Sequence, residues 1–197
     1  MFRILNMARR KDHTRGELSQ LAIKAGRELV IKKGTSALTA RNVAQAIGYT
    51  PGTLYNLFEN IEALTAAINI ESMHAFADKL RQTESQSNDT HTRVRNIAQA
   101  YLNFHREQPQ LWALLFAIPL EIDSEAYHQA IHRVFDQVTE AMQPLSETPE
   151  LGRQKAKILW STLHGICLLQ QSGKLNVREN DPPEELVAHF LDQFLKD

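Results

Sequence analysis

Residues 50–56 carry hydroxyl, phenol and amide side chains at positions that helical spacing leaves outside an apolar face. These groups donate and accept hydrogen bonds, which is the chemistry that contacts phosphates and base edges rather than the chemistry that breaks bonds. The candidate groove-facing residues are Thr50, Gly52, Thr53, Tyr55 and Asn56. Two helices joined by a turn are needed to hold such a set at a surface.

The segment TARNVAQAIG has the pattern of the first of these helices. Thr39 is a residue type that caps helix N-termini. Val43, Ala44 and Ile47 then follow at helical spacing and give the helix one apolar face. Gly48 comes next and can adopt the left-handed backbone conformation that ends a helix, so we predict a sharp turn there.

A second helix is predicted directly after the turn. Thr50 is its expected cap, and Pro51 occupies the first helical position, where its missing N–H costs nothing. Leu54, Leu57 and Phe58 recur at helical spacing and are expected to face the core. The two helices and their glycine turn are typical of a helix-turn-helix, which places its second helix in a DNA groove. The alternative is a pair of short helices in an ordinary helical protein.

Charge favours the DNA-binding interpretation. Residues 1–60 carry ten Lys or Arg against four Asp or Glu, whereas residues 61–197 carry twelve against nineteen. The near-neutral total therefore conceals a basic N-terminal end and an acidic body. A basic module beside a recognition helix is the electrostatic feature expected of a phosphate-binding surface.

The stretch from Leu21 to Leu64 resembles the DNA-binding domain of the tetracycline-repressor (TetR) family. The resemblance rests on a first helix ending in Lys33-Gly34, on LTARNVAQAIG and YTPGTLYNLF, and on an acidic helix start before Leu64. It implies that Thr39 and Arg41 contact phosphates and that the turn and the second helix supply contacts to the groove and the DNA backbone. The DNA-binding residues so implied are Thr39, Arg41, Tyr49, Thr50, Thr53, Tyr55 and Asn56.

Two positions depart from the family pattern. Ile61 stands where the family usually has a phosphate-contacting lysine, and Arg41, Lys32 or Lys33 are candidates to replace that contact. Asn56 stands where a histidine or an aromatic residue is frequent, which bears on sequence preference.

The rest of the chain favours a compact cytoplasmic protein. No apolar run approaches the about 20 residues of a membrane helix, and the opening MFRILN is too short and too polar-flanked for a signal peptide. Residues 1–13 are expected to form a basic arm, and Met7 is an alternative start. The single cysteine, Cys167, excludes an internal disulfide and is expected to be a buried, inert thiol.

We predict an all-α fold of about nine helices, because no strand-like alternation is sustained. The expected domains are a DNA-binding unit over residues 1–59 and a helical body over residues 60–197, in which the polar loop 83–92 is a further natural boundary. Expected helices include 111–118, Ser124–Met142 and two that start at Thr148-Pro149 and Asp181-Pro182.

The last two helices are expected to form a dimer surface, since reading a palindromic site requires two recognition helices. The small residues Ser161, Thr162 and Gly165 would let another helix approach closely. Packing of both faces inside one chain is the alternative. The interface residues predicted on these helices are Leu159, Leu163, Ile166, Phe190 and Phe194. By resemblance the two helices would form a four-helix bundle with their mates, and Trp160 to Leu175 resembles a WHG-type C-terminal domain.

Aromatic residues with a few polar tips indicate a small-molecule pocket in the body, although such residues also form ordinary cores. The candidate lining is Tyr101, Phe104, His105, Trp112, Phe116, Tyr127, Trp160 and His164. No charged residue dominates this set, which favours an apolar or aromatic effector. Population shift would then release a repressor dimer from its operator.

Other classes of protein were weighed. His128, His132 and Asp136 share one helical face with metal-ligand spacing, but that face is polar and no HExxH pattern, phosphate-binding glycine loop or GxSxG elbow accompanies it. We therefore expect no enzyme, no metal and no cofactor. An effector-independent architectural or adaptor protein bound to DNA remains the alternative function.

Overall fold

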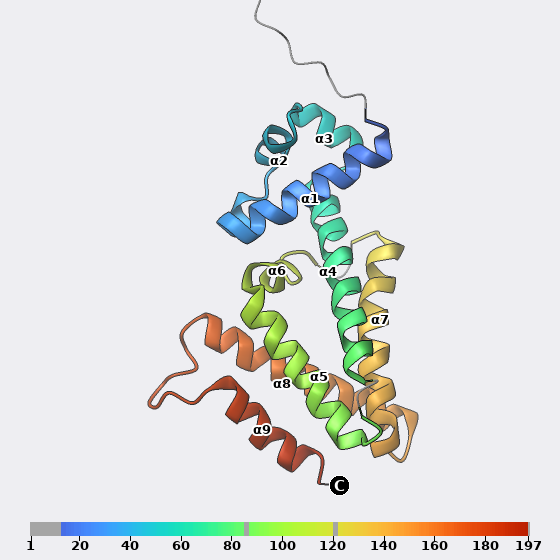
Figure 1. Ribbon diagram of the computed structural model, residues 1–197, viewed down its shortest axis with the longest axis vertical. Helices are drawn as coiled ribbons and strands as arrows, with labels where there is room; N and C mark the ends of the chain where they lie inside the picture. The colour runs from blue at the N-terminus through green and yellow to red at the C-terminus, as the bar shows by residue number, and fades with distance from the viewer. Residues whose placement is uncertain (1–12, 85–86, 120–121, 197) are drawn as a thin grey trace, which may run out of the picture. The chain divides into compact units, whose positions relative to one another are not determined.

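The computed structural model describes residues 13–84, 87–119 and 122–196, and within these ranges it contains nine α-helices, two short 3-10 turns and no strand (Figure 1). The predicted all-α fold is confirmed. The helices are α1 (Arg15–Lys33), α2 (Ala40–Ile47), α3 (Pro51–Leu57), α4 (Ile61–Glu84), α5 (Thr90–Glu107), α6 (Pro109–Leu114), α7 (Glu125–Met142), α8 (Pro149–Gln171) and α9 (Pro183–Phe194), with 3-10 turns at Thr35–Ala37 and Gln143–Leu145.

The chain divides into two compact units, Met1–Leu64 and Thr65–Asp197. The division falls inside α4, a few residues beyond the 59/60 boundary expected from the sequence and well before the polar loop. A helix that continues across a boundary gives no break in composition, which is why the sequence pattern placed it differently.

The N-terminal unit packs α1, α2 and α3 around a small apolar centre. Thr14 and Glu17 form a reciprocal capping box at the start of α1, and Gly34, at φ 85°, ends it. The buried residues at the centre include Leu18, Ala22, Val30, Val43, Ala44 and Leu54. Three short helices with one apolar face each can bury those faces only against one another, which holds α3 in place.

The C-terminal unit is a helical bundle in which α5 packs against α7, α8 and α9. Its main core gathers large side chains from these helices and from α4 and α6, including Leu80, Ile97, Trp112, Met142, Leu159 and Leu191. A smaller apolar cluster joins Met73 of α4 to Tyr127 and Ala130 of α7. Cys167 lies in the main core, and burial raises the pKa of its thiol to about 12.

Two helix starts and ends differ from the sequence prediction. The helix expected over 111–118 begins at Pro109 and ends at Leu114, after which the Phe116 and Ala117 amides bond to carbonyls three residues back. The last helix begins at Pro183, with extended Pro182 as its cap, so Asp181 does not cap it. The Thr148 cap of α8 is confirmed, since its hydroxyl accepts from the Leu151 amide at 3.2 Å.

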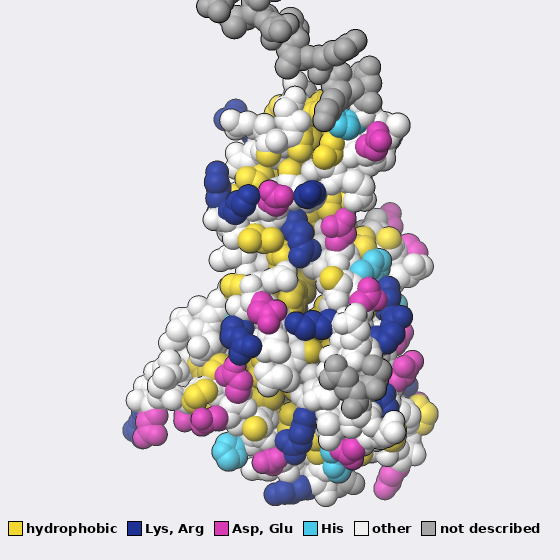
Figure 2. Space-filling model, in the orientation of Figure 1, with side chains coloured by type: hydrophobic (Ala, Val, Ile, Leu, Met, Phe, Trp, Pro, Cys, Tyr) yellow, Lys and Arg dark blue, Asp and Glu magenta, His cyan; other side chains and the backbone are white. Residues whose placement is uncertain are grey.

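Ion pairs between helices lie on the surface of the C-terminal unit. Arg95 pairs with Asp192 and Arg106 with Glu184, which links α5 to α9. In Figure 2, side chains of both signs are interspersed over this unit. Exposed pairs contribute little stability individually, so the apolar core must hold the bundle. No helix among the described residues is long and apolar enough to cross a membrane.

Candidate nucleic-acid interface

The first short helix of the candidate interface is held at both ends as the sequence predicts. The Thr39 hydroxyl accepts from the Asn42 amide at 3.2 Å, and Asn42 in turn donates from its side chain to the Ala37 carbonyl at 2.9 Å. Val43 and Ala44 are buried against the rest of the unit. Gly48 has φ 78°, the left-handed conformation that ends α2 and turns the chain.

The second helix, α3, starts within three residues of that turn. The Thr50 hydroxyl accepts from the Thr53 amide at 3.3 Å, and Pro51 fills the first helical position. Leu54 is buried and anchors the inner face of α3. This local order leaves the opposite face of α3 outside the core of the unit.

The structure places the predicted DNA-contacting residues on one segment with differing exposure. Thr39, Arg41, Thr50, Tyr55 and Asn56 are exposed. Tyr55 is a large aromatic side chain and is 57% exposed. The other two predicted contacts, Tyr49 and Thr53, are half-buried. Their roles toward DNA stay predictions.

One residue near this surface was missed by sequence reasoning. The Tyr49 hydroxyl lies 3.0 Å from Nδ1 of His13, and the two rings are 6.2 Å apart at an angle of 57°. His13 precedes the Thr14 cap of α1, so it is distant in sequence from the turn. A lone histidine outside any periodic pattern carries no signal that would have pointed to this contact. The remainder of the basic arm predicted over residues 1–13 lies outside the described residues.

The positions proposed to replace the usual family lysine differ in their surroundings. Lys32 pairs with Glu28 on α1 at 3.2 Å, whereas Arg41 and Lys33 are exposed. Ile61 is the first residue of α4 and is half-buried. An apolar side chain there packs instead of reaching out, which leaves Arg41 as the cation on α2.

In the C-terminal unit, six of the eight predicted pocket residues come together. Trp112 contacts two histidine rings, each with its centroid 4.8 Å away: His164 is stacked on the indole, whereas His105 meets it edge-on. His164 further contacts Phe116 at 4.0 Å and Trp160 at 6.0 Å, and its Nδ1 lies 3.2 Å from the Tyr101 hydroxyl. We call these six residues the aromatic cluster: Tyr101, His105, Trp112, Phe116, Trp160 and His164.

The other two predicted pocket residues lie elsewhere. Phe104 stacks on Phe76 in the main core, with ring centroids 5.3 Å apart. Tyr127 belongs to the smaller apolar cluster, where its hydroxyl donates to the Leu115 carbonyl at 3.5 Å. Both residues face the core of the unit, as the alternative interpretation of the pattern allowed.

Electrostatics keep the aromatic cluster neutral. Burial lowers the pKa of His105, and burial together with the charge of His105 lowers the pKa of His164. Burial raises the pKa of the Tyr101 hydroxyl. Among the described residues, no hydrogen-bond partner is present for the buried Nε2 of His105. A buried polar atom without a partner is unusual.

Two of the five predicted dimer contacts, Leu159 and Leu163, are 0% and 2% exposed and belong to the chain's own core. Ile166, Phe190 and Phe194 are half-buried against the same core. The apolar pattern of these helices is thus met in part by packing within one chain, and the roles of the five residues in a dimer stay predictions.

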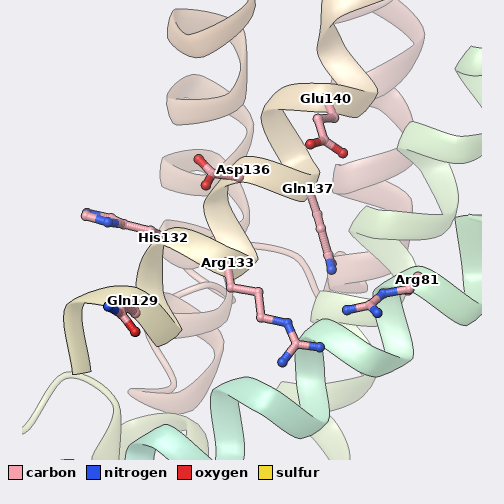
Figure 3. Close-up of a pocket in the computed structure, with 7 residues that line it drawn as sticks. All are labelled: Arg81, Gln129, His132, Arg133, Asp136, Gln137 and Glu140. Atoms are coloured by element: carbon pink, nitrogen blue, oxygen red, sulfur yellow. The ribbon is translucent and has the colours of Figure 1, made fainter. Parts of the chain in front are cut away.

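An open groove of about 580 Å³ runs between α4 and α7. It holds the polar face that was weighed as a metal site, and Figure 3 shows His132 and Asp136 projecting away from α4 while Arg133 extends toward it. Arg133 pairs with Asp78 of α4 at 2.7 Å. The described residues contain no group of three His, Cys, Asp or Glu placed to hold a metal ion. The groove therefore is a mixed polar surface between two helices.

Comparison with known families follows the same division of the chain. Residues 22–68 match the family described as "Bacterial regulatory proteins, tetR family", and residues 94–194 match "Tetracyclin repressor-like, C-terminal domain". The chain belongs to the TetR family of transcriptional regulators. The C-terminal description is broader than the WHG-type resemblance, which stays a prediction.

Individual relatives are similar at moderate to low identity. The chain is 29% identical over 111 residues to the nucleoid occlusion factor SlmA of Pasteurella multocida, a match that spans 54% of each chain. It is 24% identical over 166 residues to the HTH-type transcriptional regulator Rv0681 of Mycobacterium tuberculosis, covering 84% of this chain and 72% of that one.

Among solved structures, the fatty acid degradation regulator FadR from Bacillus halodurans superimposes with a TM-score of 0.69 at 18% identity, over 93% of this chain and 97% of that one. At this identity the likeness shows the shared fold.

Proposed function

We propose that this TetR-family regulator is a homodimeric repressor that a small, largely apolar or aromatic effector releases from a palindromic operator. The observation that carries the proposal is the helix-turn-helix itself. A left-handed Gly48 and a Thr50 cap hold α3, and Tyr55 is more than half exposed on it. An exposed phenol on a helix anchored by its other face is suited to reach a groove.

The proposed contacts divide by chemistry. Thr39 and Arg41 lie at the first turn of α2 and are assigned to phosphates, since a hydroxyl and a guanidinium both donate to phosphate oxygens. Tyr55 and Asn56 on α3 are assigned to base edges in the major groove. Thr50 serves as both helix cap and backbone contact.

The outer face of α8 is the proposed dimer surface. Ile158, Leu168 and Leu169 are 50%, 51% and 43% exposed, on the side opposite the buried Leu159 and Leu163. Gly165 lies between them, and a Cβ built there meets no atom within 4 Å. Large apolar side chains flanking an open glycine let a second α8 approach closely and bury the exposed leucines.

The aromatic cluster is the proposed effector site. None of its six residues carries a fixed charge, and the lowered histidine pKa values keep both imidazoles neutral near pH 7. Phe116 and Trp160 are exposed at its edge, whereas Trp112 is buried. An uncharged ring or chain with one polar atom would satisfy the unpartnered Nε2 of His105.

Coupling between the two activities is assigned to α4. This helix begins in the N-terminal unit and continues into the C-terminal unit, where Asn69 donates to the Leu114 carbonyl at the end of α6 at 3.0 Å. An effector that binds more tightly when α6 occupies one of two positions would, through this hydrogen bond, also favour one position of α4. Such an effector shifts the population away from the DNA-binding state by its difference in affinity for the two states.

The proposal is tested by incubating the purified protein with a pool of random duplexes at moderate salt and sequencing the retained fraction. An enriched palindrome supports a dimeric, sequence-specific regulator. Effectors are then screened with that duplex by fluorescence, because the only two tryptophans, Trp112 and Trp160, both belong to the aromatic cluster. Compounds that change tryptophan emission and release the duplex support the effector site.

A second candidate function is an effector-independent architectural or adaptor protein. This second function is supported by the 29% identity, over 111 residues, to a nucleoid occlusion factor. Binding to the enriched duplex that no apolar or aromatic compound reverses would favour this second function. Binding without any enriched sequence would favour an architectural role.

A further inference from the structure

The contact between His13 and Tyr49 joins two ends of the DNA-binding unit that are far apart in sequence. Nδ1 of His13 lies 3.0 Å from the Tyr49 hydroxyl in a partly buried setting. The Tyr49 amide donates to the Ala44 carbonyl at 2.8 Å, which fixes the backbone of this residue to α2. The tyrosine is thus held at its backbone by α2 and at its phenol by the residue preceding α1.

The start of α1 is rigid enough to position His13. The Thr14 amide and hydroxyl both donate to the Glu17 carboxylate, at 2.8 and 2.9 Å, and the Glu17 amide donates back to the Thr14 hydroxyl at 3.3 Å. These bonds lower the pKa of Glu17, and the charge of His13 lowers it further. A capping box that fixes Thr14 also fixes the direction in which the preceding residue leaves the helix.

The hydrogen bond limits where the Tyr49 ring can point. Either group can be the donor, because the roles depend on the tautomer of the imidazole, and in both cases the phenol oxygen lies 3.0 Å from Nδ1 of His13. Tyr49 immediately precedes Thr50, the cap of the recognition helix, so the contact joins His13 to the residue ahead of that helix.

We propose that His13 is a positioning residue for DNA binding, which holds the Tyr49 side chain, directly ahead of the recognition helix, in one orientation for contact with the DNA backbone. The proposal rests on the DNA-binding function proposed above and adds a residue outside the helix-turn-helix to it. His13 acts through Tyr49 and makes no phosphate contact of its own.

The test is a double-mutant cycle in the full-length protein, read by fluorescence anisotropy with a fluorescein-labelled random-sequence duplex and with the duplex enriched by selection. The variants are His13→Ala, Tyr49→Phe and the double variant. His13→Asn is the conservative variant, because its side-chain amide nitrogen occupies the place of Nδ1. His91→Asn, at an exposed histidine at the start of α5, is the matched control.

Each single variant is expected to lower the affinity for both duplexes about three- to tenfold, which corresponds to the loss of one hydrogen bond. The double variant should lose no more than the larger single loss, and His13→Asn should stay within about twofold of the wild type. The slope of affinity against salt should not change in His13→Ala, because no cationic contact is lost.

Wild-type affinity in His13→Ala would overturn the proposal, as would losses in the double variant that multiply. A salt slope reduced by about one unit would show that His13 contacts phosphate directly, which also contradicts a positioning role. If His13→Ala unfolds, the affinity of Tyr49→Phe still tests the proposal, because this variant loses only a hydroxyl. Wild-type affinity in Tyr49→Phe would reject the proposal. Failure of the wild type and His91→Asn to bind either duplex would instead reject the DNA-binding function itself.

Discussion

The rings of Trp112 and His164 lie stacked, with centroids 4.8 Å apart and an interplanar angle of 25°. Trp112 comes from α6 and His164 from α8, so the stack joins two helices across the C-terminal unit. His105 of α5 meets the indole edge-on at the same centroid separation, with an interplanar angle of 78°. A change in the charge of either histidine therefore places that charge in direct contact with the buried Trp112 ring.

This arrangement predicts a pH-dependent stability. The pKa values of His105 and His164 are lowered in the folded protein, so the unfolded chain binds protons first as the pH falls through the ordinary histidine value of 6.5. The free energy of unfolding should therefore decrease between about pH 7 and pH 5, by about 1 kcal/mol or less since both rings are partly solvated. Urea unfolding at several pH values measures it.

The matched variant for that measurement is His105→Gln with His164→Gln. Neither side chain titrates, so the pH dependence over this range should be flatter in the double variant than in the wild type. Equal slopes in the two proteins would place the pH dependence in other groups.

Arg41 is predicted to bind a phosphate of the DNA backbone. Arg41→Ala should weaken binding to all duplexes alike and reduce the slope of log affinity against log salt by about one unit, because one cationic contact is lost. Anisotropy titrations at several salt concentrations, with the enriched duplex and a scrambled one, measure both effects. A loss confined to one base pair of the operator would contradict this assignment.

Tyr55 is predicted to contribute to operator binding without supporting the fold. It is 57% exposed, so Tyr55→Ala should change the free energy of unfolding by no more than about 0.5 kcal/mol. Affinity for the enriched duplex should fall by about five- to 150-fold, as expected for a contact worth about 1–3 kcal/mol, while the dimer content measured by sedimentation stays constant. Thr50→Ala should weaken binding as well, with a stability loss of about 1 kcal/mol from the missing cap. If both variants bind as the wild type does, α3 is not in the interface.

The two faces of α8 are predicted to respond in opposite ways. Leu168→Glu places a charge on the exposed face and should dissociate the dimer with little change in the thermal unfolding of the monomer. Leu159→Ala opens a cavity in the core and should lower the free energy of unfolding by about 2–5 kcal/mol. Sedimentation equilibrium and urea unfolding separate the two effects. A dimer that survives Leu168→Glu unchanged would move the interface to another face.

Much of the DNA-binding unit was predictable because its signals are local. Thr39, Gly48 and Thr50 act within a few residues of themselves, through a cap, a left-handed turn and a second cap, and the structure confirms each. The Thr148 cap follows the same rule. The prediction that Asp181 caps the last helix was wrong, because Pro182 occupies the cap position and α9 begins one residue later, at Pro183.

Contacts between helices were less predictable. Apolar periodicity placed Leu159 and Leu163 on a helix face, but it could not tell whether that face met the same chain or a second copy. Tyr127 and Phe104 met the composition of a pocket lining, yet they pack into cores with Met73 and Phe76. Periodicity reports that a side chain is covered and carries no information about what covers it.

The sequence by itself determined the all-α fold, the helix-turn-helix and its exposed polar face, because capping, glycine conformation and helical spacing operate within one or two turns of chain. Only the tertiary structure decided that Trp112 stacks on His164, that α8 keeps its leucines 159 and 163 inside, and that His13 reaches Tyr49. The residues of the Trp112–His164 and His13–Tyr49 pairs are far apart in sequence, and their contact depends on how whole helices pack to exclude water.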